Sequence, residues 1–230
     1  MNKCLAVITA RGGSKRIPRK NIKLFCDKPV LSYPINAAID SKLFETIIVS
    51  TDDYEIAEVG KKLGASIPFM RSEENSNDFA TTSDVIEEVL SEYKKRLMTF
   101  EYVCCIYPAA VFVNPQKLQN SYHMLVEEKY DSVIPIVRFG HPIQRALKIE
   151  NNILKMINPN HLNTRSQDLP PSYHDAAQFY WLNTKSFLSQ KKLFMDNTGA
   201  FEIPELEVQD IDNEVDWALA EIKYQKMKKN

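Results

Sequence analysis

The stretch 4–23, CLAVITARGGSKRIPRKNIK, constrains the fold of this chain more than any other. It begins with a continuous apolar run at 5–8, whose length and β-branched content are typical of a buried parallel strand. The run ends in Arg11-Gly12-Gly13-Ser14, where paired glycines allow backbone N–H groups to approach a ligand closely. A strand followed by such a turn at the start of an α/β chain predicts a ligand site at the carboxyl end of that strand.

Six cations follow the predicted strand, and no acid interrupts them before Asp27. A turn of backbone amides with this many cations is suited to several negative charges at once, so we expect a nucleoside triphosphate. The loop differs from a Walker P-loop, which needs Gly-Lys-Ser/Thr, and from a dinucleotide fingerprint, which needs a third glycine. A solvated basic turn is the alternative. The six cations are Arg11, Lys15, Arg16, Arg19, Lys20 and Lys23.

The hydrophobic pattern after the loop alternates between helices and strands joined by short turns, which indicates a mostly parallel sheet. From 138 to about 172 the pattern loosens around a predicted hairpin at Asn151-Asn152, and we expect a lid or a dimer arm there. The predicted helices are 29–41, 54–63, 82–97, 114–128 and 214–226, and the later predicted strands are 46–50, 102–107, 131–137 and 208–213.

Length and composition fit one α/β domain spanning residues 1–230. The net charge is −1, so the basic loop is a local feature, and this balance disfavours nucleic-acid binding. No apolar run approaches the roughly 18 residues of a membrane span and no signal peptide precedes the first strand, so we expect a cytoplasmic protein without membrane contact. The four cysteines lack zinc-ligand spacing and are expected to be free thiols; they are Cys4, Cys26, Cys104 and Cys105.

Two aspartates near the end of the chain, Asp210 and Asp212, flank the apolar Ile211. On the predicted strand at 208–213 both would project to the same face. Paired carboxylates suit Mg²⁺, which binds one or two of them together with phosphate oxygens and water. Capping of the last helix is the alternative role for this segment, and Asn213 can fill it while Asp212 faces the metal.

Two further polar motifs are candidates for substrate contact. Thr81, Thr82 and Ser83 begin the predicted helix at 82–97, where hydroxyls and free amides provide either an anion site or plain capping. Farther along the chain, Arg165 and Gln167 form a cation–amide pair suited to the carboxylate and hydroxyls of an acidic sugar.

The loop from Ala10 to Asn21 reads Ala-Arg-Gly-Gly-Ser-Lys-Arg-Ile-Pro-Arg-Lys-Asn and resembles the signature loop of the nonulosonate cytidylyltransferases. These enzymes activate sialic-acid-type sugars with CTP. The resemblance implies an α/β fold, a Rossmann-like (GT-A-like) three-layer sandwich with a mostly parallel mixed sheet, and Mg²⁺ as the cofactor. It also implies a homodimer in which the excursion at 138–172 helps to close the partner's site.

The resemblance also implies roles for individual residues. The catalytic residues would be Arg11, Lys20, Asp210 and Asp212, with the two aspartates as metal ligands. CTP would be bound by Ala10, Arg11, Gly12, Gly13, Ser14, Lys15, Lys20, Asn21, Arg71 and Thr82. An acidic nine-carbon sugar would be bound by Tyr107, Arg165, Gln167, His174, Asp175 and Gln178. His174 taken alone is more often a surface or packing histidine than a catalytic one.

Two departures from the sialic acid synthetases bear on the sugar. Where they have Gln-Pro-Thr-Ser-Pro, this chain has Tyr107-Pro-Ala-Ala, which indicates a less polar sugar periphery. Where they have Asn-Gly-Ala, it has His174-Asp175-Ala-Ala-Gln178, which resembles the pseudaminic acid branch of the family. The resemblance therefore implies CMP transfer from CTP to the anomeric hydroxyl of pseudaminic acid, with release of pyrophosphate. The alternatives are N-acetylneuraminate, legionaminate or 3-deoxy-octulosonate as the sugar, a non-catalytic nucleotide-sugar binding module, or a nucleic-acid binder.

Overall fold

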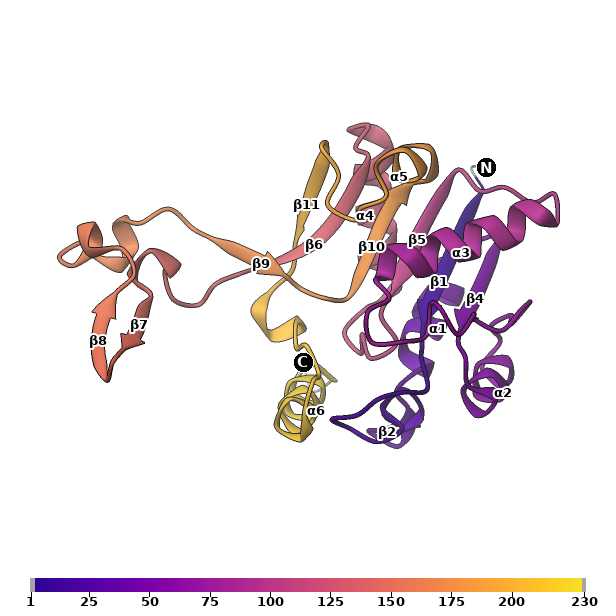
Figure 1. Ribbon diagram of the computed structural model, residues 1–230, viewed down its shortest axis with the longest axis horizontal. Helices are drawn as coiled ribbons and strands as arrows, with labels where there is room; N and C mark the ends of the chain where they lie inside the picture. The colour runs from indigo at the N-terminus through magenta and orange to yellow at the C-terminus, as the bar shows by residue number, and fades with distance from the viewer. Residues whose placement is uncertain (1–2, 229–230) are drawn as a thin grey trace.

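A computed structural model, which describes residues 3–228, has a central sheet covered by helices on both faces (Figure 1). The strands β1, β4 and β5 are parallel neighbours and β11 is parallel to β6, whereas β10 runs antiparallel between β5 and β6. This arrangement confirms the mixed, mostly parallel sheet expected from the sequence. In sheet order the strands are β11 (Thr198–Glu202), β6 (Ser132–Arg138), β10 (Phe179–Asn183), β5 (Tyr102–Ile106), β1 (Cys4–Thr9) and β4 (Thr46–Ser50), and β9 (Tyr173–Asp175) pairs with β6.

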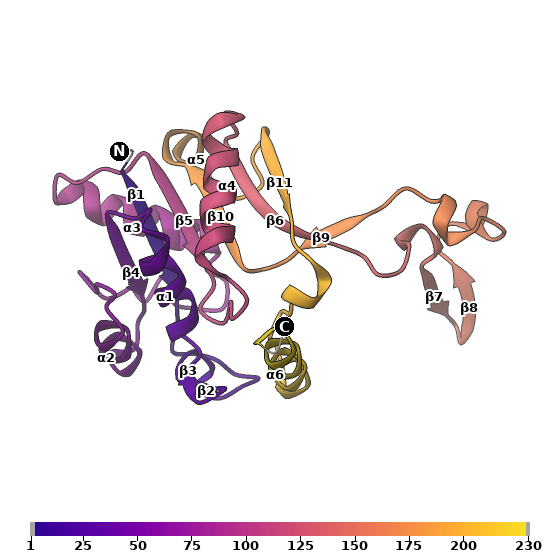
Figure 2. The ribbon, with the colours of Figure 1, turned by 180° about the vertical axis from the view of Figure 1, so that it is seen from behind.

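The alternation of side chains along β1 explains the three layers. Cys4, Ala6 and Ile8 point into a core shared with one set of helices, and Leu5 and Val7 point into a second core on the opposite face. Figure 1 views the sheet from the side of the second core and Figure 2 from the side of the first. The first set is α1 (Ser32–Ser41), α2 (Tyr54–Lys62) and α4 (Pro115–Glu127), and the second is α3 (Thr82–Lys95) and α5 (Thr184–Gln190).

Local signals in the sequence account for the starts of several helices. Pro34 lies in the first turn of α1, where its missing N–H costs nothing. The carboxylate of Asp53 accepts the N–H groups that begin α2, and the Asn114 side chain does the same ahead of Pro115 in α4. Thr81 and Asp84 form a capping box at the start of α3, so Thr81 fills the capping role and leaves the Thr82 hydroxyl for other contacts.

The predicted strand at 208–213 is wrong. After β11 the chain turns through the 3₁₀ helix η5 (Glu205–Glu207), and the segment that follows pairs with no described strand. Side chains satisfy its backbone instead: Lys223 Nζ donates to the Val208 carbonyl at 2.6 Å, and Asp216 accepts the Asp212 N–H at 3.0 Å. The last helix, α6 (Glu214–Lys228), then begins after Asn213, whose side chain accepts the N–H groups of Val215 and Asp216 as its predicted capping role requires.

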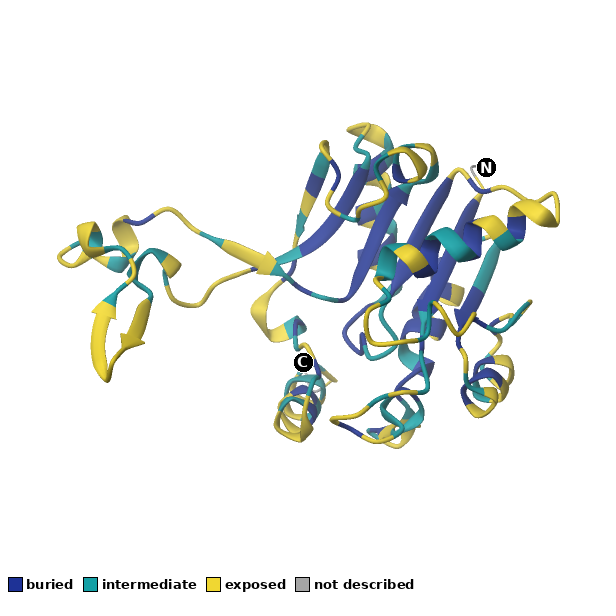
Figure 3. Ribbon diagram, viewed as in Figure 1, coloured by how far each residue is buried: buried dark blue, intermediate teal, exposed yellow. Residues whose placement is uncertain are grey.

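An arm formed by residues 139–172 leaves the sheet after β6 and returns at β9 (Figure 1). Its tip is the hairpin of β7 (Leu147–Glu150) and β8 (Ile153–Met156), and the turn residues Asn151 and Asn152 both have positive φ, as a two-residue hairpin turn requires. Figure 3 shows the hairpin strands as exposed in contrast to the buried sheet. The predicted excursion and its hairpin are therefore present.

The four cysteines are free in the structure, and Cys4, Cys104 and Cys105 are buried in strands as expected. None of the helices within residues 3–228 is long and apolar enough to cross a lipid bilayer.

The ion pair between Asp53 and Arg19 is expected to make stability depend on pH. Hydrogen bonding to Arg19 lowers the pKa of Asp53 from 3.8 to about 2. Because the folded-state pKa is below the unfolded value, this stabilisation is complete above about pH 4 and is lost as the pH falls towards 2. Asp53→Asn keeps a capping side chain but removes the charge. We therefore expect its free energy of unfolding at neutral pH to be about 1–2 kcal/mol lower than that of the wild type. Chemical denaturation at pH 7 and pH 3 measures the difference in unfolding free energy between the wild type and the variant. A difference that is as large at pH 3 as at pH 7 would contradict the lowered pKa of Asp53.

Candidate active site

The basic loop that follows β1 is held in place by the turn between β4 and α2. The Gly12 N–H donates to the Asp52 carboxylate at 2.8 Å. A Cβ on Gly12 would lie 2.9 Å from a carboxylate oxygen of Asp53, so this close approach requires glycine. Asp53 also pairs with Arg19 at the far end of the loop, and the Asn21 amide donates to the Arg11 carbonyl at 2.8 Å. Asp53 is also the N-cap of α2, so the turn before this helix both starts the helix and holds the loop.

Most of the loop cations already have acidic partners from distant segments. Arg11 and Lys15 both donate to Asp78, at 3.1 and 2.5 Å. Arg16 donates to Asp212 at 2.8 Å. The Lys20 ammonium donates to the Ile211 carbonyl at 2.7 Å, and burial lowers its pKa below the ordinary lysine value. The loop is therefore a cluster of positive charge whose resting partners are carboxylates, the groups that phosphates can replace.

A cavity of about 580 Å³ lies over this loop and has a neighbour on each side. It shares Thr9 and Arg11 with a cavity of about 200 Å³ next to α3, and Asp212 with a cavity of about 400 Å³ next to β9. The three cavities therefore adjoin one another along the carboxyl ends of the parallel strands, where folds of this kind bind ligands. The largest is lined by Thr9, Arg11, Ser14, Lys15, Arg16, Ile17, Lys20, Asn21, Tyr107, Pro108 and Asp212.

The cavity next to α3 contains the two CTP-binding residues predicted outside the loop, Arg71 and Thr82. Arg71 is 7% exposed, and its guanidinium donates to the hydroxyl and the carbonyl of Ser50. Burial lowers the pKa of Arg71. Asn21 is also buried, and within residues 3–228 its Oδ1 accepts no hydrogen bond, which leaves an acceptor free beside the loop. Ala10 is fully buried where β1 ends, so its contribution is the backbone.

The cavity next to β9 has an acidic wall made by Asp210, Asp212 and Asp216. Burial and the neighbouring Asp212 raise the pKa of Asp210, and Lys20 opposes this shift. The described residues contain no group of three or more histidine, cysteine or acidic side chains placed to hold a metal alone. Two carboxylates that repel each other across a water-accessible cavity fit Mg²⁺, because a divalent cation relieves their repulsion and takes its remaining ligands from phosphate and water.

The sugar-binding residues predicted near the sheet lie in different surroundings. Tyr107 lines the large cavity, and His174 lines the acidic one and packs on Phe139 with ring centroids 4.7 Å apart. Asp175 points inward, and its carboxylate accepts from the Tyr180 hydroxyl at 2.6 Å. Gln178 departs from the prediction of sugar contact: it is 2% exposed and donates to the Glu207 carbonyl at 2.7 Å. It therefore positions the segment that leads to Asp210.

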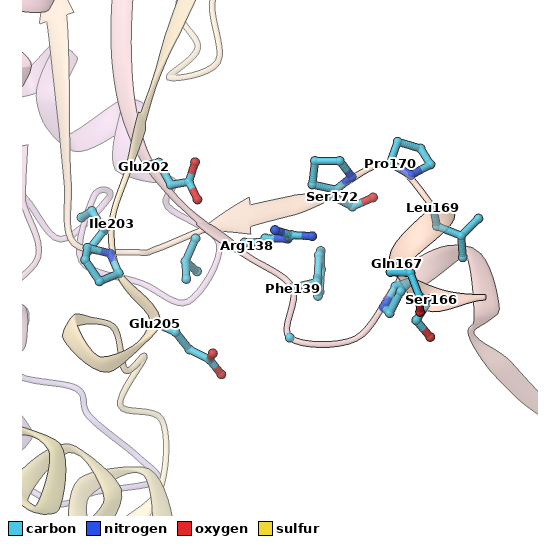
Figure 4. Close-up of a pocket in the computed structure, with 15 residues that line it drawn as sticks. Arg138, Phe139, Ser166, Gln167, Leu169, Pro170, Ser172, Glu202, Ile203 and Glu205 are labelled. Carbon is cyan, nitrogen blue, oxygen red and sulfur yellow. The ribbon is translucent and has the colours of Figure 1, made fainter. Parts of the chain in front are cut away.

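The arm carries the other two predicted sugar-binding residues away from the loop. Arg165 is exposed and pairs with Asp168 in its own 3₁₀ turn, η4 (Ser166–Asp168), at 2.7 Å. Gln167 lines a cavity of about 370 Å³ at the base of the arm. Figure 4 shows Gln167 and Ser166 at the arm end of that cavity and Glu202 and Glu205 at its sheet end. The chain therefore does not bring Arg165 to its own basic loop.

Some contacts that shape the site had no recognisable sequence signal. Lys117 in α4 is buried, and its ammonium pairs with Glu207 at 2.7 Å and donates to the Phe112 carbonyl at 2.8 Å. Together with Gln178 it fixes the turn ahead of the two aspartates. Asp78 and Tyr180 were likewise unpredicted, because an isolated acid or a tyrosine in an apolar run carries no pattern of its own.

A Rossmann-like sheet whose basic loop faces a pair of carboxylates defines a nucleotidyltransferase. The chain belongs to the cytidylyltransferase family, whose model matches residues 5–227. It is 38% identical over 223 residues to the pseudaminic acid cytidylyltransferase of Campylobacter jejuni subsp. jejuni serotype O:2, covering 96% of each chain. It is 33% identical to the CMP-N,N'-diacetyllegionaminic acid synthase of Legionella pneumophila, covering 94% of each.

A solved structure supports the fold. The CMP:2-keto-3-deoxy-manno-octonic acid synthetase complexed with CTP superposes with a TM-score of 0.70, covering 99% of this chain and 100% of that one. Its sequence identity is 14%, so the likeness concerns the arrangement of the backbone. The predicted fold class and the predicted cytidylyltransferase activity are confirmed.

Proposed function

We propose that this cytidylyltransferase couples CTP to the anomeric hydroxyl of pseudaminic acid and forms CMP-pseudaminic acid and pyrophosphate. One observation carries the proposal: Asp212 lines the same cavity as the cationic loop and pairs with Arg16 at 2.8 Å, and it shares the neighbouring cavity with Asp210. A triphosphate bound to the loop would have its α-phosphate within reach of the loop cations and of the aspartates. Transfer to a sugar hydroxyl beside the aspartates requires this position.

In this reaction the sugar oxygen forms a bond to the α-phosphorus, the bond to the bridging oxygen breaks, and pyrophosphate leaves. Positioning and charge neutralisation account for most of the rate in such a transfer. Arg11, Ser14 and Lys15 would bind the triphosphate, and Lys20 would neutralise charge beside the α-phosphate. Asn21, Arg71 and Thr82 would hold the nucleoside, the last two in the small cavity next to α3.

Asp210 and Asp212 are the residues that would hold Mg²⁺. When bound, the ion would neutralise phosphate charge and favour the ionised form of the attacking hydroxyl. His174 shares their cavity and would contact the sugar from the side of β9.

The choice of sugar rests on similarity and on two positions. The relative at 38% identity is named for pseudaminic acid and the one at 33% for diacetyllegionaminic acid. Tyr107 and the His174-Asp175 pair favour the first, because a tyrosine ring and an imidazole suit a less polar sugar than the amide and hydroxyls of sialic acid synthetases. Legionaminate, N-acetylneuraminate and 3-deoxy-octulosonate are the alternatives.

Pyrophosphate release from CTP and Mg²⁺ tests the function, with pseudaminic acid, N-acetylneuraminate and legionaminate assayed in parallel. We expect release with pseudaminic acid. Release with another sugar alone would keep the reaction and overturn the choice of substrate. Binding of CTP without release from any of the sugars would point to a nucleotide-sugar binding module. The four free thiols suit a reducing cytoplasm, where we place the reaction.

We further propose a homodimer in which the arm of each subunit reaches the site of the other. The arm exposes apolar side chains that a monomer would leave in water: Ile149 and Leu154 face each other across the hairpin and are 74% and 63% exposed. In such a dimer, the partner subunit would supply Arg165 and Gln167 to the acidic end of the site.

Replacing both apolar residues of this hairpin face is expected to dissociate the dimer. Ile149→Ser/Leu154→Ser removes the contact area, whereas Lys148→Ser/Lys155→Ser changes the adjacent cross-strand pair and serves as the matched control. Light scattering after gel filtration should give a dimer for the wild type and the control and a monomer for the apolar variant. A wild-type monomer at assay concentration would contradict the proposal.

A further inference from the structure

Two side chains from distant elements hold Glu207, which lies three residues ahead of Asp210. Lys117 in α4 pairs through its ammonium with the Glu207 carboxylate at 2.7 Å. The side-chain amide of Gln178, just before β10, donates to the Glu207 carbonyl at 2.7 Å. Both the side chain and the backbone of Glu207 are therefore anchored, and the chain runs from this anchor directly to the first aspartate.

The same two residues also hold the turn at 107–113, whose first two residues line the largest cavity. The Lys117 ammonium donates a second hydrogen bond to the Phe112 carbonyl at 2.8 Å. The backbone carbonyl of Gln178 accepts the Tyr107 N–H at 2.8 Å. Lys117 and Gln178 therefore connect this wall of the largest cavity with the segment that carries the aspartates.

Apolar packing joins the same turn to the residue between the two aspartates. Ile211 is 2% exposed and belongs to a buried cluster that also contains Val111 and Phe112 of the turn. Because buried side chains are closely packed, a shift of the turn is transmitted to Ile211 and so to both of its neighbours. Phe112 thus contacts the metal segment through its ring and the Lys117 ammonium through its carbonyl.

The stability of the fold does not by itself account for an ion pair at this place. Lys117 is 7% exposed, and removing such a charge from water is costly. Apolar side chains of similar volume often replace a buried ion pair without loss of stability. Two short bonds from one ammonium instead fix the separation between Phe112 and Glu207. Mg²⁺ requires such precision, because its ligands form a near-ideal octahedron at about 2.0–2.1 Å.

We propose that Lys117 and Glu207 form a positioning pair that holds Asp210 and Asp212 in the geometry needed for Mg²⁺ and thereby sets the affinity of the site for the metal. The inference rests on the proposed function, because it takes the two aspartates as the metal ligands. Neither member of the positioning pair is among the described residues that line the two cavities of the aspartates. Both therefore act through the segment that follows Glu207.

We would measure the dissociation constant of CTP by calorimetry on the full chain without sugar, once with Mg²⁺ and once with EDTA. Mg²⁺ should tighten CTP binding by the wild type, because two ligands that share a site stabilise each other. Lys117→Met and Glu207→Ala should leave the affinity in EDTA unchanged and lose most of this tightening. In the assay of pyrophosphate release, both should need about tenfold more Mg²⁺ for half-maximal rate, as is typical when the support of metal ligands is lost.

Two further variants separate positioning from charge and from stability. Glu207→Gln keeps an oxygen that accepts from Lys117, so we expect its response to Mg²⁺ to stay close to that of the wild type. If the negative charge of Glu207 attracted the metal, this variant would be as weak as Glu207→Ala. Lys117→Met/Glu207→Leu replaces both charges by apolar side chains and should melt close to the wild type, yet keep the weakened response to Mg²⁺. It keeps the test valid if Lys117→Met alone does not fold.

Glu87→Ala is the matched control, because Glu87 in α3 forms an ion pair of the same length, 2.7 Å, with Lys191. It should respond to Mg²⁺ as the wild type does. Unchanged tightening in Glu207→Ala, or recovery of the Mg²⁺ response in the double variant, would overturn the positioning pair and leave the proposed function in place. A wild type whose CTP binding and activity are indifferent to Mg²⁺ would instead overturn the metal assignment and the positioning pair with it.

Discussion

Replacing Asp212 by asparagine is expected to lower kcat/KM for the transfer reaction about a thousandfold. Asparagine has the same shape, so the backbone bonds of the segment, including the Asp212 N–H to Asp216, should persist. The charge that would hold Mg²⁺ is lost, and Arg16 loses its resting partner. Steady-state pyrophosphate release over a range of Mg²⁺ concentrations measures the effect.

The expected signature is a fall in kcat that additional Mg²⁺ restores only in part. Asp40→Asn, at the exposed end of α1, is the matched control and should behave as the wild type. Full activity of Asp212→Asn, with an unaltered response to Mg²⁺, would show that this carboxylate does not hold the metal.

Replacing Lys20 by methionine is expected to lower kcat/KM about a hundredfold or more, with weaker CTP binding as a second symptom. Lys20 is half-buried, donates to the Ile211 carbonyl, and is a cation close to both Asp210 and Asp212. Methionine fills a similar volume but leaves that carbonyl without its donor and Asp210 without its neighbouring cation.

The exposed Lys62→Met in α2 controls for the loss of a lysine as such. Both variants should melt cooperatively, and only Lys20→Met should require more CTP to reach half-maximal rate. An unchanged KM and kcat in Lys20→Met would remove Lys20 from the site.

The sequence predicts those parts of the fold that depend on local patterns of residues. The buried strand before Arg11, the first-turn Pro34 and the capping Asn114 all depend on neighbours within a few residues. β10 and β11 were not predicted, because an antiparallel strand between β5 and β6 is defined by partners far away in the chain. The alternation at 208–213 looked like a strand, but side chains satisfy the backbone of that segment.

The same limit applies to the site. The run of cations after β1 can be recognised in the sequence alone. The same is true of Asp210 and Asp212, which flank Ile211. The ion pair between Arg11 and Asp78 forms only after folding. The same holds for the hydrogen bond that Tyr180 donates to Asp175. Sequence patterns therefore predicted the charged ends of the site and missed the buried contacts that orient them.

The way the arm is joined to the sheet has a consequence for how such proteins can diversify. Both ends of the arm are fixed by the pairing of β6 with β9, from Ile136 with Asp175 to Arg138 with Tyr173. The entropy lost in closing a loop rises slowly, by about 0.6 kcal/mol for each doubling of its length. Residues can be added to or removed from the arm at little thermodynamic cost to the sheet, so the surface of the arm can change during evolution while the framework of the sheet stays the same.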